Sequence, residues 1–377
     1  MRIRQAVLGW MDDAALAPLV SIEPQLVLAF GAVRHFEDPG LPPFLARSFP
    51  LARRLGCSTA GEISSGGVGD GTLVVTAISF ARPDLSVATT EIAGAKDSRA
   101  AGARLAAGLG PAAAVSVLGQ GVDINGSALI AGLAESLGPD VTISGALAGD
   151  GGAFRRTWVL AEGAASSSLI AAIGFGPGGP SVSSGSAGGW KPFGAARRAT
   201  RAEGNVLIEL DGEPALQVYR RYLGDYAKDL PSSGLLFPLA ILNADRSDTG
   251  VTRTLLGVDD ASGSITLAGD VAEGGYLRLM HAGTDALVDG AEVAARSARP
   301  AGSRRGDSLA LLFSCVGRKL VFGDAVEEEV EAVGSVLGAG WTLTGFYSNG
   351  EIGPGREGLC RLHNQTMTVT CLTEDGS

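Results

Sequence analysis

Three copies of one short phrase constrain this chain more than any other feature of its sequence. The phrase is a glycine, four residues, a second glycine and a carboxylate, and it occurs at residues 56–62 (GCSTAGE) and 345–351 (GFYSNGE). A looser copy, with three residues between its glycines, lies at residues 145–150 (GALAGD). Related phrases within one chain indicate a structural unit that is repeated.

The residues around each phrase predict a common order of elements. Short apolar runs predict strands, and longer segments that begin at a capping residue predict helices. The strands predicted in the three units lie at 26–32 and 73–80, then 113–118, 141–144 and 169–175, then 309–315, 341–343 and 359–372. The helices predicted in the second and third units lie at 96–109, at 127–137 with Asn125 or Ser127 as its cap, and at 324–337 with Asp324 as its cap.

A strand, a helix and a strand within about thirty residues form a βαβ unit with parallel strands and a right-handed crossover. The strand that returns after each phrase can lie antiparallel to them. We therefore expect an α/β (α+β) fold in which mixed sheets carry helices on their faces and are built from repeated βαβ-β units. Residues 157–160 and 169–175 are predicted to pair, and the Gly, Pro and Ser of residues 176–189 predict a boundary or an exposed loop.

The second half of the chain adds further elements. Helices are predicted at 213–227 and at 284–298, the latter capped by Thr284, and short antiparallel strands are predicted within 240–280. We expect two domains, residues 25–215 and residues 216–372.

Composition excludes several classes of function. The net charge of −10 is unfavourable for binding to nucleic acid or to an anionic membrane surface. No apolar run reaches the roughly 18 residues that a membrane-spanning helix needs, so no membrane insertion is expected. Four cysteines without a framework spacing predict a reduced, cytoplasmic protein.

The repeated phrases suggest a ligand site. In parallel βαβ units ligands bind beyond the carboxyl ends of the strands, where glycines let backbone amides approach a carboxylate or phosphate. Glu62, Asp150 and Glu351 could then accept hydrogen bonds from an ammonium or hydroxyl group. The alternative is structural: the glycines form tight turns, and the carboxylates cap neighbouring backbone amides.

Two other groups invite chemical hypotheses. Cys57 could be a nucleophile with His363 as its base, or simply a small buried cysteine. Cys360 and His363 are three apart on a predicted strand and would point to opposite faces, which disfavours a zinc site. The dense polar run that begins at His363 and Asn364 could contact a ligand or lie on a half-exposed strand. No metal site and no cofactor are predicted.

Several motifs resemble the FIST family (F-box and intracellular signal transduction). The first two phrases and Trp190-Lys191-Pro192-Phe193-Gly194 resemble its N-terminal domain. The motifs that resemble its C-terminal domain are residues 211–216, Phe237-Pro238-Leu239, Cys315-Val316-Gly317-Arg318, Gly345–Pro354 and His363-Asn364-Gln365-Thr366. The resemblance implies a sensory module that binds small molecules such as amino acids, without an established catalytic mechanism. No output module is recognisable, so a separate signalling protein would read the signal.

The preferred hypothesis is a cytoplasmic, non-enzymatic sensor of a small polar metabolite, with its site where the three phrases converge. Arg318 could pair with an acidic group of that ligand. One alternative is a Cys-dependent hydrolase or transferase acting on a small amide or thioester. Another is a ligand-free interaction scaffold, in which the glycine turns pack against each other. The candidate ligand-binding residues are Cys57, Ser58, Thr59, Glu62, Asp150, Arg318, Ser348, Asn349, Glu351, His363 and Asn364.

Overall fold

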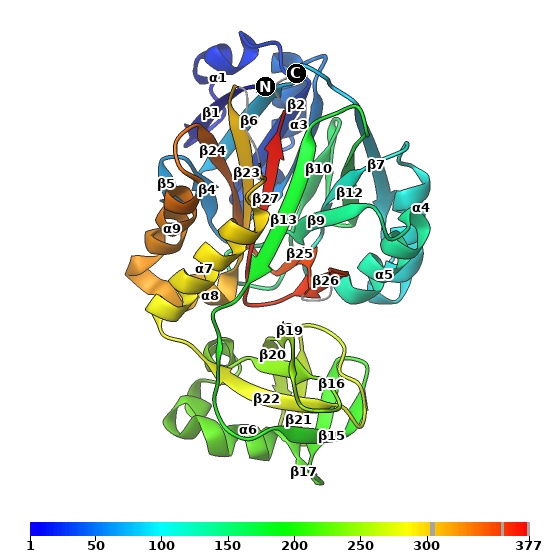
Figure 1. Ribbon diagram of the computed structural model, residues 1–377, viewed down its shortest axis with the longest axis vertical. Helices are drawn as coiled ribbons and strands as arrows, with labels where there is room; N and C mark the ends of the chain where they lie inside the picture. Colours follow the sequence, from blue (N-terminus) through cyan, green and yellow to red (C-terminus); the bar gives the residue numbers. More distant parts are fainter. Residues whose placement is uncertain (302–305, 356–357, 375–377) are drawn as a thin grey trace.

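The chain folds into two bodies joined by two short links (Figure 1). The computed structural model describes residues 1–301, 306–355 and 358–374. The larger body contains three six-stranded sheets with their helices, and we call it the three-sheet body. The smaller body is a nine-stranded sheet with one α-helix, built from residues 191–281, and we call it the inserted domain.

The three sheets of the larger body share one strand order. Sheet 1 contains β1 (Arg2–Leu8), β6 (Leu73–Ser79), β2 (Leu26–Gly31), β3 (Arg53–Ser58), β10 (Val159–Ala161) and β11 (Ala164–Ser166). Sheet 2 contains β7 (Leu85–Glu91), β12 (Leu169–Phe175), β8 (Ala114–Gly119), β9 (Thr142–Leu147), β25 (Gly350–Pro354) and β26 (Cys360–His363). Sheet 3 contains β13 (Ser181–Ala187), β27 (Met367–Thr373), β23 (Ser308–Cys315), β24 (Trp341–Ser348), β4 (Glu62–Ser64) and β5 (Gly67–Gly69).

Each sheet is completed by a hairpin from another unit. The pairs β2–β3, β8–β9 and β23–β24 are parallel, and a returning strand lies antiparallel to the first member of each. The hairpin β4–β5 leaves unit 1 for sheet 3, β10–β11 leaves unit 2 for sheet 1, and β25–β26 leaves unit 3 for sheet 2. The predicted mixed sheets and repeated βαβ-β units are confirmed, and each phrase marks the place where the chain changes sheet.

Three local predictions were wrong, the first two because of this exchange. Residues 157–160 and 169–175 do not pair, since β10 joins sheet 1 and β12 joins sheet 2. The predicted strand 359–372 is interrupted between β26 and β27, which belong to different sheets, and Gln365 turns the chain with φ 63°. Residues 176–189 contain strand β13 at the edge of sheet 3.

Helices cover the outer face of each sheet. Sheet 1 packs against α1 (Asp13–Val20), α2 (Val33–Glu37) and α3 (Leu41–Ser48), and sheet 2 against α4 (Ser98–Ala107) and α5 (Gly126–Leu137). Sheet 3 packs against α7 (Thr284–Ala298), α8 (Val316–Phe322) and α9 (Glu327–Leu337). Short 3-10 turns are η1 (Ala95–Asp97) and η4 (Gly323–Ala325).

Capping explains where some helices begin. The Asn125 side chain accepts a hydrogen bond from the Ala128 amide, as predicted for a cap of α5. The predictions of Thr284 and Asp324 as caps were wrong. The N-cap residue of α7 is Gly283 and that of α9 is Val326, and neither makes a side-chain cap bond.

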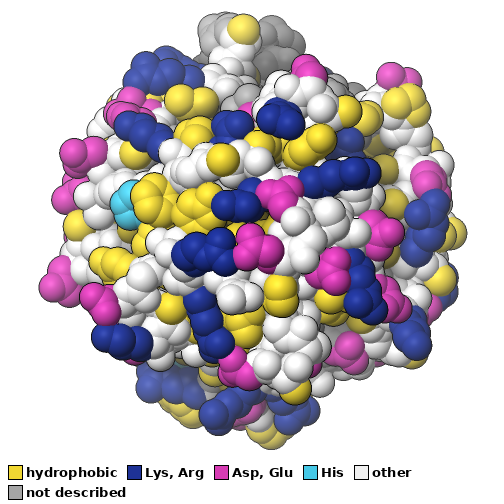
Figure 2. Space-filling view, turned by 90° about the horizontal axis from the view of Figure 1, so that it is seen from below, with side chains coloured by type: hydrophobic (Ala, Val, Ile, Leu, Met, Phe, Trp, Pro, Cys, Tyr) yellow, Lys and Arg dark blue, Asp and Glu magenta, His cyan; other side chains and the backbone are white. Residues whose placement is uncertain are grey.

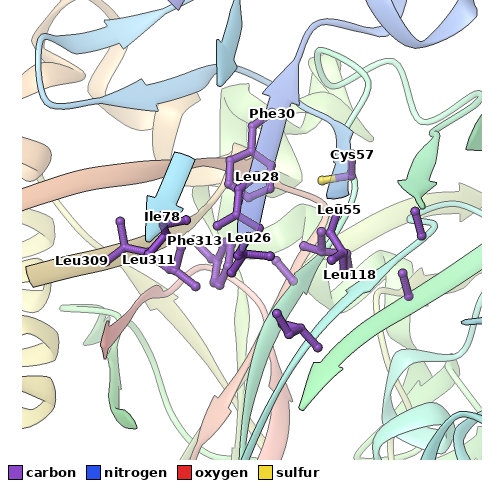
Figure 3. Close-up of a cluster of buried hydrophobic side chains, with 14 of the residues drawn as sticks. Leu26, Leu28, Phe30, Leu55, Cys57, Ile78, Leu118, Leu309, Leu311 and Phe313 are labelled. Atoms are coloured by element: carbon purple, nitrogen blue, oxygen red, sulfur yellow. The ribbon is translucent and has the colours of Figure 1, made fainter. Parts of the chain in front are cut away.

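The inner faces of the three sheets meet in one apolar core (Figure 3). Phe30 of sheet 1 and Phe313 of sheet 3 both contact Phe346, with ring centroids 4.9 and 5.3 Å apart respectively. Leu118 of sheet 2 belongs to the same cluster. Because the central strands are buried on both faces, they read as continuous apolar runs such as LVLAFG in β2.

The inserted domain confirms the antiparallel strands predicted within 240–280. Its elements are β14 (Lys191–Pro192), β15 (Arg197–Glu203), β16 (Val206–Leu210), β17 (Glu213–Pro214), α6 (Ala215–Leu223), η2 (Gly224–Asp229), η3 (Ser232–Leu236), β18 (Leu239–Leu242), β19 (Asp248–Arg253), β20 (Leu255–Asp259), β21 (Ser264–Leu267) and β22 (Tyr276–His281). The predicted helix 213–227 is thus shorter and ends at Gly224, which has φ 57°. The expected boundary between residues 215 and 216 falls inside this domain.

Seen from below, this end of the molecule carries basic and acidic side chains side by side (Figure 2). Ion pairs of the inserted domain include Arg220–Asp260 and Arg221–Glu213, each with N and O atoms 2.6 Å apart. Such exposed pairs each contribute at most about 1 kcal/mol to stability. Among the described residues, no helix is both long and apolar enough to cross a bilayer.

Candidate functional site

The three repeated phrases meet and bond to one another. The Ala60 amide donates to the Tyr347 carbonyl, and the Tyr347 amide donates to the Gly61 carbonyl, each at 2.8 Å. The Gly149 amide donates to the Ser58 carbonyl at 2.9 Å, and the Asn349 amide donates to the Leu147 carbonyl at 3.2 Å. We call the place where residues 56–62, 145–150 and 345–351 meet the corner junction. The backbone amides named above bond to neighbouring phrases and are therefore not free to bind a ligand.

The first glycine of each phrase is required by the neighbouring strand. Gly345 lies opposite Leu312 in the parallel pair, and a Cβ atom on Gly345 would be 1.8 Å from the Leu312 carbonyl oxygen. A Cβ atom on Gly56 would likewise be 2.0 Å from the Ala29 carbonyl oxygen, and one on Gly145 would be 2.0 Å from the Val117 carbonyl oxygen. No real Cβ tolerates such distances, so these glycines serve strand packing.

The carboxylates Glu62 and Glu351 fasten the turn to the returning strand. Glu351 Oε1 accepts a hydrogen bond from the Ser348 hydroxyl at 2.6 Å, and Oε2 accepts from the amide and hydroxyl of Thr366 at 3.1 and 3.0 Å. Glu62 makes the same pattern with the amide and hydroxyl of Thr72, at 2.8 and 2.7 Å. The two threonines immediately precede β27 and β6, so each carboxylate closes its unit.

Glu62 and Glu351 each close a unit, and we call these two carboxyl groups clasps. Burial changes the pKa of both. It raises the pKa of Glu351 to about 8 and raises that of Glu62 as well, against the opposing effect of the donated hydrogen bonds. The Thr59 hydroxyl donates to Glu62. Asp150 in the second phrase binds backbone amides of the following loop instead. Its Oδ1 accepts from the Phe154 amide at 2.9 Å, and its Oδ2 accepts from the amides of Arg155 and Arg156. All three carboxylates therefore have partners within the chain.

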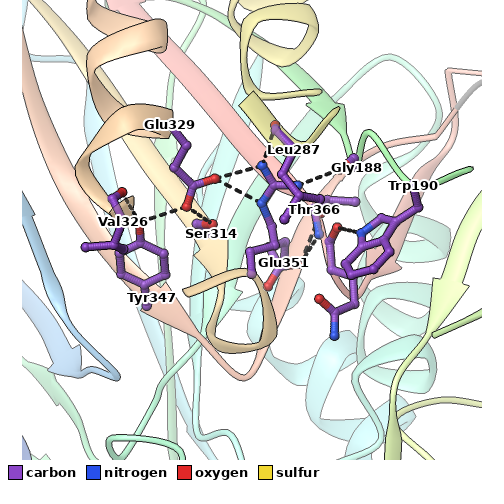
Figure 4. A network of polar contacts seen from close by, with 11 residues as sticks. Gly188, Trp190, Leu287, Ser314, Val326, Glu329, Tyr347, Glu351 and Thr366 are labelled. Atoms are coloured by element: carbon purple, nitrogen blue, oxygen red, sulfur yellow. Dashed lines mark hydrogen bonds and ion pairs between the residues drawn. The ribbon is translucent and has the colours of Figure 1, made fainter. Parts of the chain in front are cut away.

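Figure 4 shows a buried polar network around Glu329 and Tyr347, and Arg318 belongs to this network. Its Nε and Nη2 atoms lie 3.0 and 2.7 Å from Oε2 of Glu329, and both side chains are fully buried. Nη1 donates to the Gly188 carbonyl at 2.6 Å, and Nη2 donates to the Leu287 carbonyl at 2.9 Å. The other oxygen of Glu329 accepts from the Tyr347 hydroxyl at 2.7 Å. Arg318 thus already has a two-bond acidic partner, and it connects α8 to α7 and to the end of β13.

Cys57 and Ser58 are buried at the end of β3. Cys57 lies in the central core (Figure 3), where burial raises the pKa of its thiol well above the ordinary value. Ser58 locks two phrases together, because its hydroxyl donates to the Gly149 carbonyl at 2.7 Å and accepts from the Trp158 amide at 2.9 Å.

Residues 363–366 hold the inserted domain against the three-sheet body, and we call them the HNQT link. All four are 3% exposed or less. The Gln365 side-chain amide donates to the Leu235 carbonyl at 2.9 Å, and the Trp190 indole donates to the Gln365 carbonyl at 2.7 Å. The Thr252 hydroxyl donates to the Asn364 carbonyl. The HNQT link therefore bonds directly to the inserted domain, at Leu235 and at Thr252.

His363 leaves one nitrogen without a partner. Its Nε2 lies 3.3 Å from the Gly353 carbonyl oxygen, which can only accept, so the proton of the neutral ring is on Nε2. Burial lowers the pKa of His363 to about 4, with a further lowering by Arg253. Nδ1 is consequently a buried acceptor, and no described residue donates to it. Buried polar atoms without partners are uncommon in folded proteins and call for a ligand, a water or an ion.

A cavity of about 500 Å³ borders His363, and we call it the interdomain cleft. His363 and Thr366 line it from the HNQT link, and Asp289 lines it from α7. Lys191 and Asp248 line it from the inserted domain. Of the residues proposed from sequence, only His363 lines this cleft; the corner junction lies elsewhere. Lys191 and the two aspartates were missed, although Lys191 belongs to the WKPFG motif that the sequence singles out.

Two family models match consecutive parts of this chain. A model of the FIST N domain matches residues 25–213, and a model of the FIST C domain matches residues 215–354. Uncharacterized protein Mb0898c of Mycobacterium bovis and uncharacterized protein MT0897 of Mycobacterium tuberculosis are each 32% identical over 263 residues. These matches cover 67% of this chain and 62% of each relative.

A further relative, uncharacterized protein MT0656 of Mycobacterium tuberculosis, is 31% identical over 242 residues, which is 62% of this chain and 60% of that protein. The chain thus spans about three fifths of the length of these relatives. FIST domains are sensory domains of signal transduction. Because the two domain models together cover residues 25–354 almost without a gap, the chain belongs to the FIST family.

Proposed function

We propose that this protein is a cytoplasmic sensor that binds a small polar metabolite, such as an amino acid, non-covalently in the interdomain cleft. One observation carries the proposal: His363, only 2% exposed, has an acceptor nitrogen without a partner and borders a cavity of ligand size. A separate signalling protein would read the bound state. The four free cysteines support the cytoplasmic assignment.

The charges around the cleft favour a zwitterion. Nδ1 of the neutral His363 can accept a hydrogen bond from an ammonium group, and Asp289 on α7 adds negative charge. Lys191, on the opposite body, is exposed and can pair with a carboxylate. A hydrogen bond to a charged group contributes about 1.5–3 kcal/mol, so two such contacts give useful affinity.

The position of the cleft supports a sensory role. Its walls belong to different bodies, which are connected in the chain by residues 188–190 and 282–283 and held by the HNQT link. A ligand that contacts both walls favours the arrangement in which they are close, and this population shift is a signal that a partner can read.

Binding is favoured over catalysis by the state of Cys57. A cysteine nucleophile needs an accessible thiolate, whereas this thiol is 0% exposed and its pKa is raised by burial. The scaffold alternative accounts for the packed corner junction, but it does not account for the open interdomain cleft or for the unpartnered nitrogen of His363.

A thermal-shift screen tests the proposal. Amino acids and related metabolites at millimolar concentration should raise the melting temperature, since a ligand at 100 times its Kd stabilises the fold by about 2.7 kcal/mol. His363→Leu should abolish the shift. His35→Leu is the matched control, because His35 is equally buried and contacts the Gly71 carbonyl at 3.2 Å but does not line the cleft. No stabilisation at several pH values, or an unchanged shift in His363→Leu, would count against the proposal.

A further inference from the structure

A second cavity, of about 410 Å³, lies between the two bodies and shares no lining residue with the interdomain cleft. It is bordered by the ends of β8 and β9, the start of α5, and residues 267–270 of the inserted domain. Asp270 is the one charged residue among those that line it. Its larger apolar lining residues are Ile124, Leu147, Phe154, Leu256, Leu267 and Leu362.

Asn349 lines this cavity, and its side chain carries an acceptor without a partner among the described residues. Its Nδ2 donates to the Gly121 carbonyl at 3.2 Å, which assigns Oδ1 to the other side of the amide. Oδ1 is shielded from solvent, and no described residue donates to it. Leaving such an atom without a partner is unfavourable. A ligand group that donates one hydrogen bond would satisfy it.

The other side-chain amides around the cavity are bonded within the chain. Asn125 caps α5 through its oxygen, and its Nδ2 lies 3.2 and 3.3 Å from the two carboxylate oxygens of Asp270. Asn205 donates through Nδ2 to the Leu267 carbonyl at 2.8 Å. Among the described residues at this cavity, Asn349 Oδ1 is therefore the buried side-chain amide oxygen that still lacks a donor.

Asp270 alone would favour a positively charged ligand, but a buried cation lies close to the cavity. Arg253 is 8% exposed and donates to the carbonyls of Leu362 and Asp270, at 3.2 and 3.4 Å. Its Nε would lie 2.6 Å from a Cβ on Gly269, which lines the cavity. The positive charge of Arg253 offsets that of Asp270, so a neutral donor suits the site better than a cation.

We propose that this cavity binds a small molecule with an apolar body and one neutral hydrogen-bond donor, such as a hydroxyl group. The apolar walls bind the body, and Oδ1 of Asn349 accepts from the donor. This ligand class is distinct from the polar metabolite of the interdomain cleft, and the proposal does not depend on that one.

Three probes with similar apolar bodies test the proposal on the full chain by calorimetry or ligand-observed NMR. 2-Phenylethanol carries a neutral donor, ethylbenzene carries none, and 3-phenylpropionate carries a negative charge. We expect the alcohol to bind about five-fold more tightly than the hydrocarbon, as one net hydrogen bond implies. The carboxylate should bind most weakly, because it has no hydrogen to donate to Oδ1 and its charge would leave water for an apolar wall.

Two variants assign the effect to the cavity. Asn349→Leu should reduce the affinity for the alcohol to that for ethylbenzene and leave ethylbenzene binding unchanged. Leu256→Trp, at a residue that is 41% exposed, should fill the cavity and weaken binding of the alcohol and the hydrocarbon alike. His35→Leu, at a buried histidine that lines neither cavity, should change no probe affinity. Absence of binding by the alcohol at millimolar concentration, or an advantage of the alcohol that survives in Asn349→Leu, would overturn the proposal.

Discussion

The corner junction and the interdomain cleft look alike in composition and differ in how their polar atoms are used. Both combine glycines with buried polar side chains. At the corner junction the oxygens of Glu62 and Glu351 all have partners, and its amides bond across the phrases. At the interdomain cleft, Nδ1 of His363 has none among the described residues. The conspicuous carboxylates are thus satisfied within the chain, whereas a less conspicuous histidine keeps an acceptor for which a ligand can be proposed.

The largest expected effect tests whether the phrase glycines are structural. Gly345→Ala places a methyl 1.8 Å from the Leu312 carbonyl oxygen and should destabilise the protein by more than about 4 kcal/mol or prevent folding. Urea denaturation followed by circular dichroism measures this. The control is Gly334→Ala in α9, where the nearest atom is 3.5 Å away and helix propensity predicts a gain of up to about 1 kcal/mol. Equal tolerance of both substitutions would contradict the structural role.

The next effect concerns the network that connects the two regions. Arg318→Met leaves Glu329 buried without its cation and should cost about 3 kcal/mol of unfolding free energy. Arg47→Met is the control, because that ion pair with Asp13 is exposed and should contribute less than about 1 kcal/mol. Chemical denaturation of both variants provides the comparison. A loss in Arg318→Met no larger than in the control would show that the network does not stabilise the fold.

The smallest effect sharpens the assignment of Glu351 as a clasp. The unfolded carboxyl loses its proton near pH 4.5, whereas the folded protein keeps it until about pH 8. Through this group, stability therefore falls as pH rises from about 4.5 to 8. At pH 6, Glu351→Gln replaces a protonated, neutral carboxyl by a neutral amide. The free energy of unfolding at that pH should therefore change by no more than about 1.5 kcal/mol.

The pH dependence separates this assignment from the alternative. Denaturation curves between pH 5 and pH 8 should show a shallower decline of stability for Glu351→Gln than for the parent protein. Identical slopes would mean that Glu351 titrates at its ordinary pKa in the fold, and that the clasp does not hold a protonated carboxyl.

The sequence by itself determined the repeated units, the mixed α/β class and the family. These follow from local properties: apolar runs such as that of β2 must be buried on both faces, and glycine is needed wherever strands approach closely, as at Gly56. The cap at Asn125 was also readable, because a cap acts within three residues.

Only the tertiary structure decided which sheet receives each hairpin and where polar atoms find partners. Glu351 meets Thr366 fifteen residues away, and Arg318 meets Gly188 at a separation of 130 residues. His363 borders a cleft whose other wall comes from the inserted domain. Satisfaction of a buried polar group depends on neighbours that folding brings together, so the same residue types could mark either a clasp or a site until those neighbours were known.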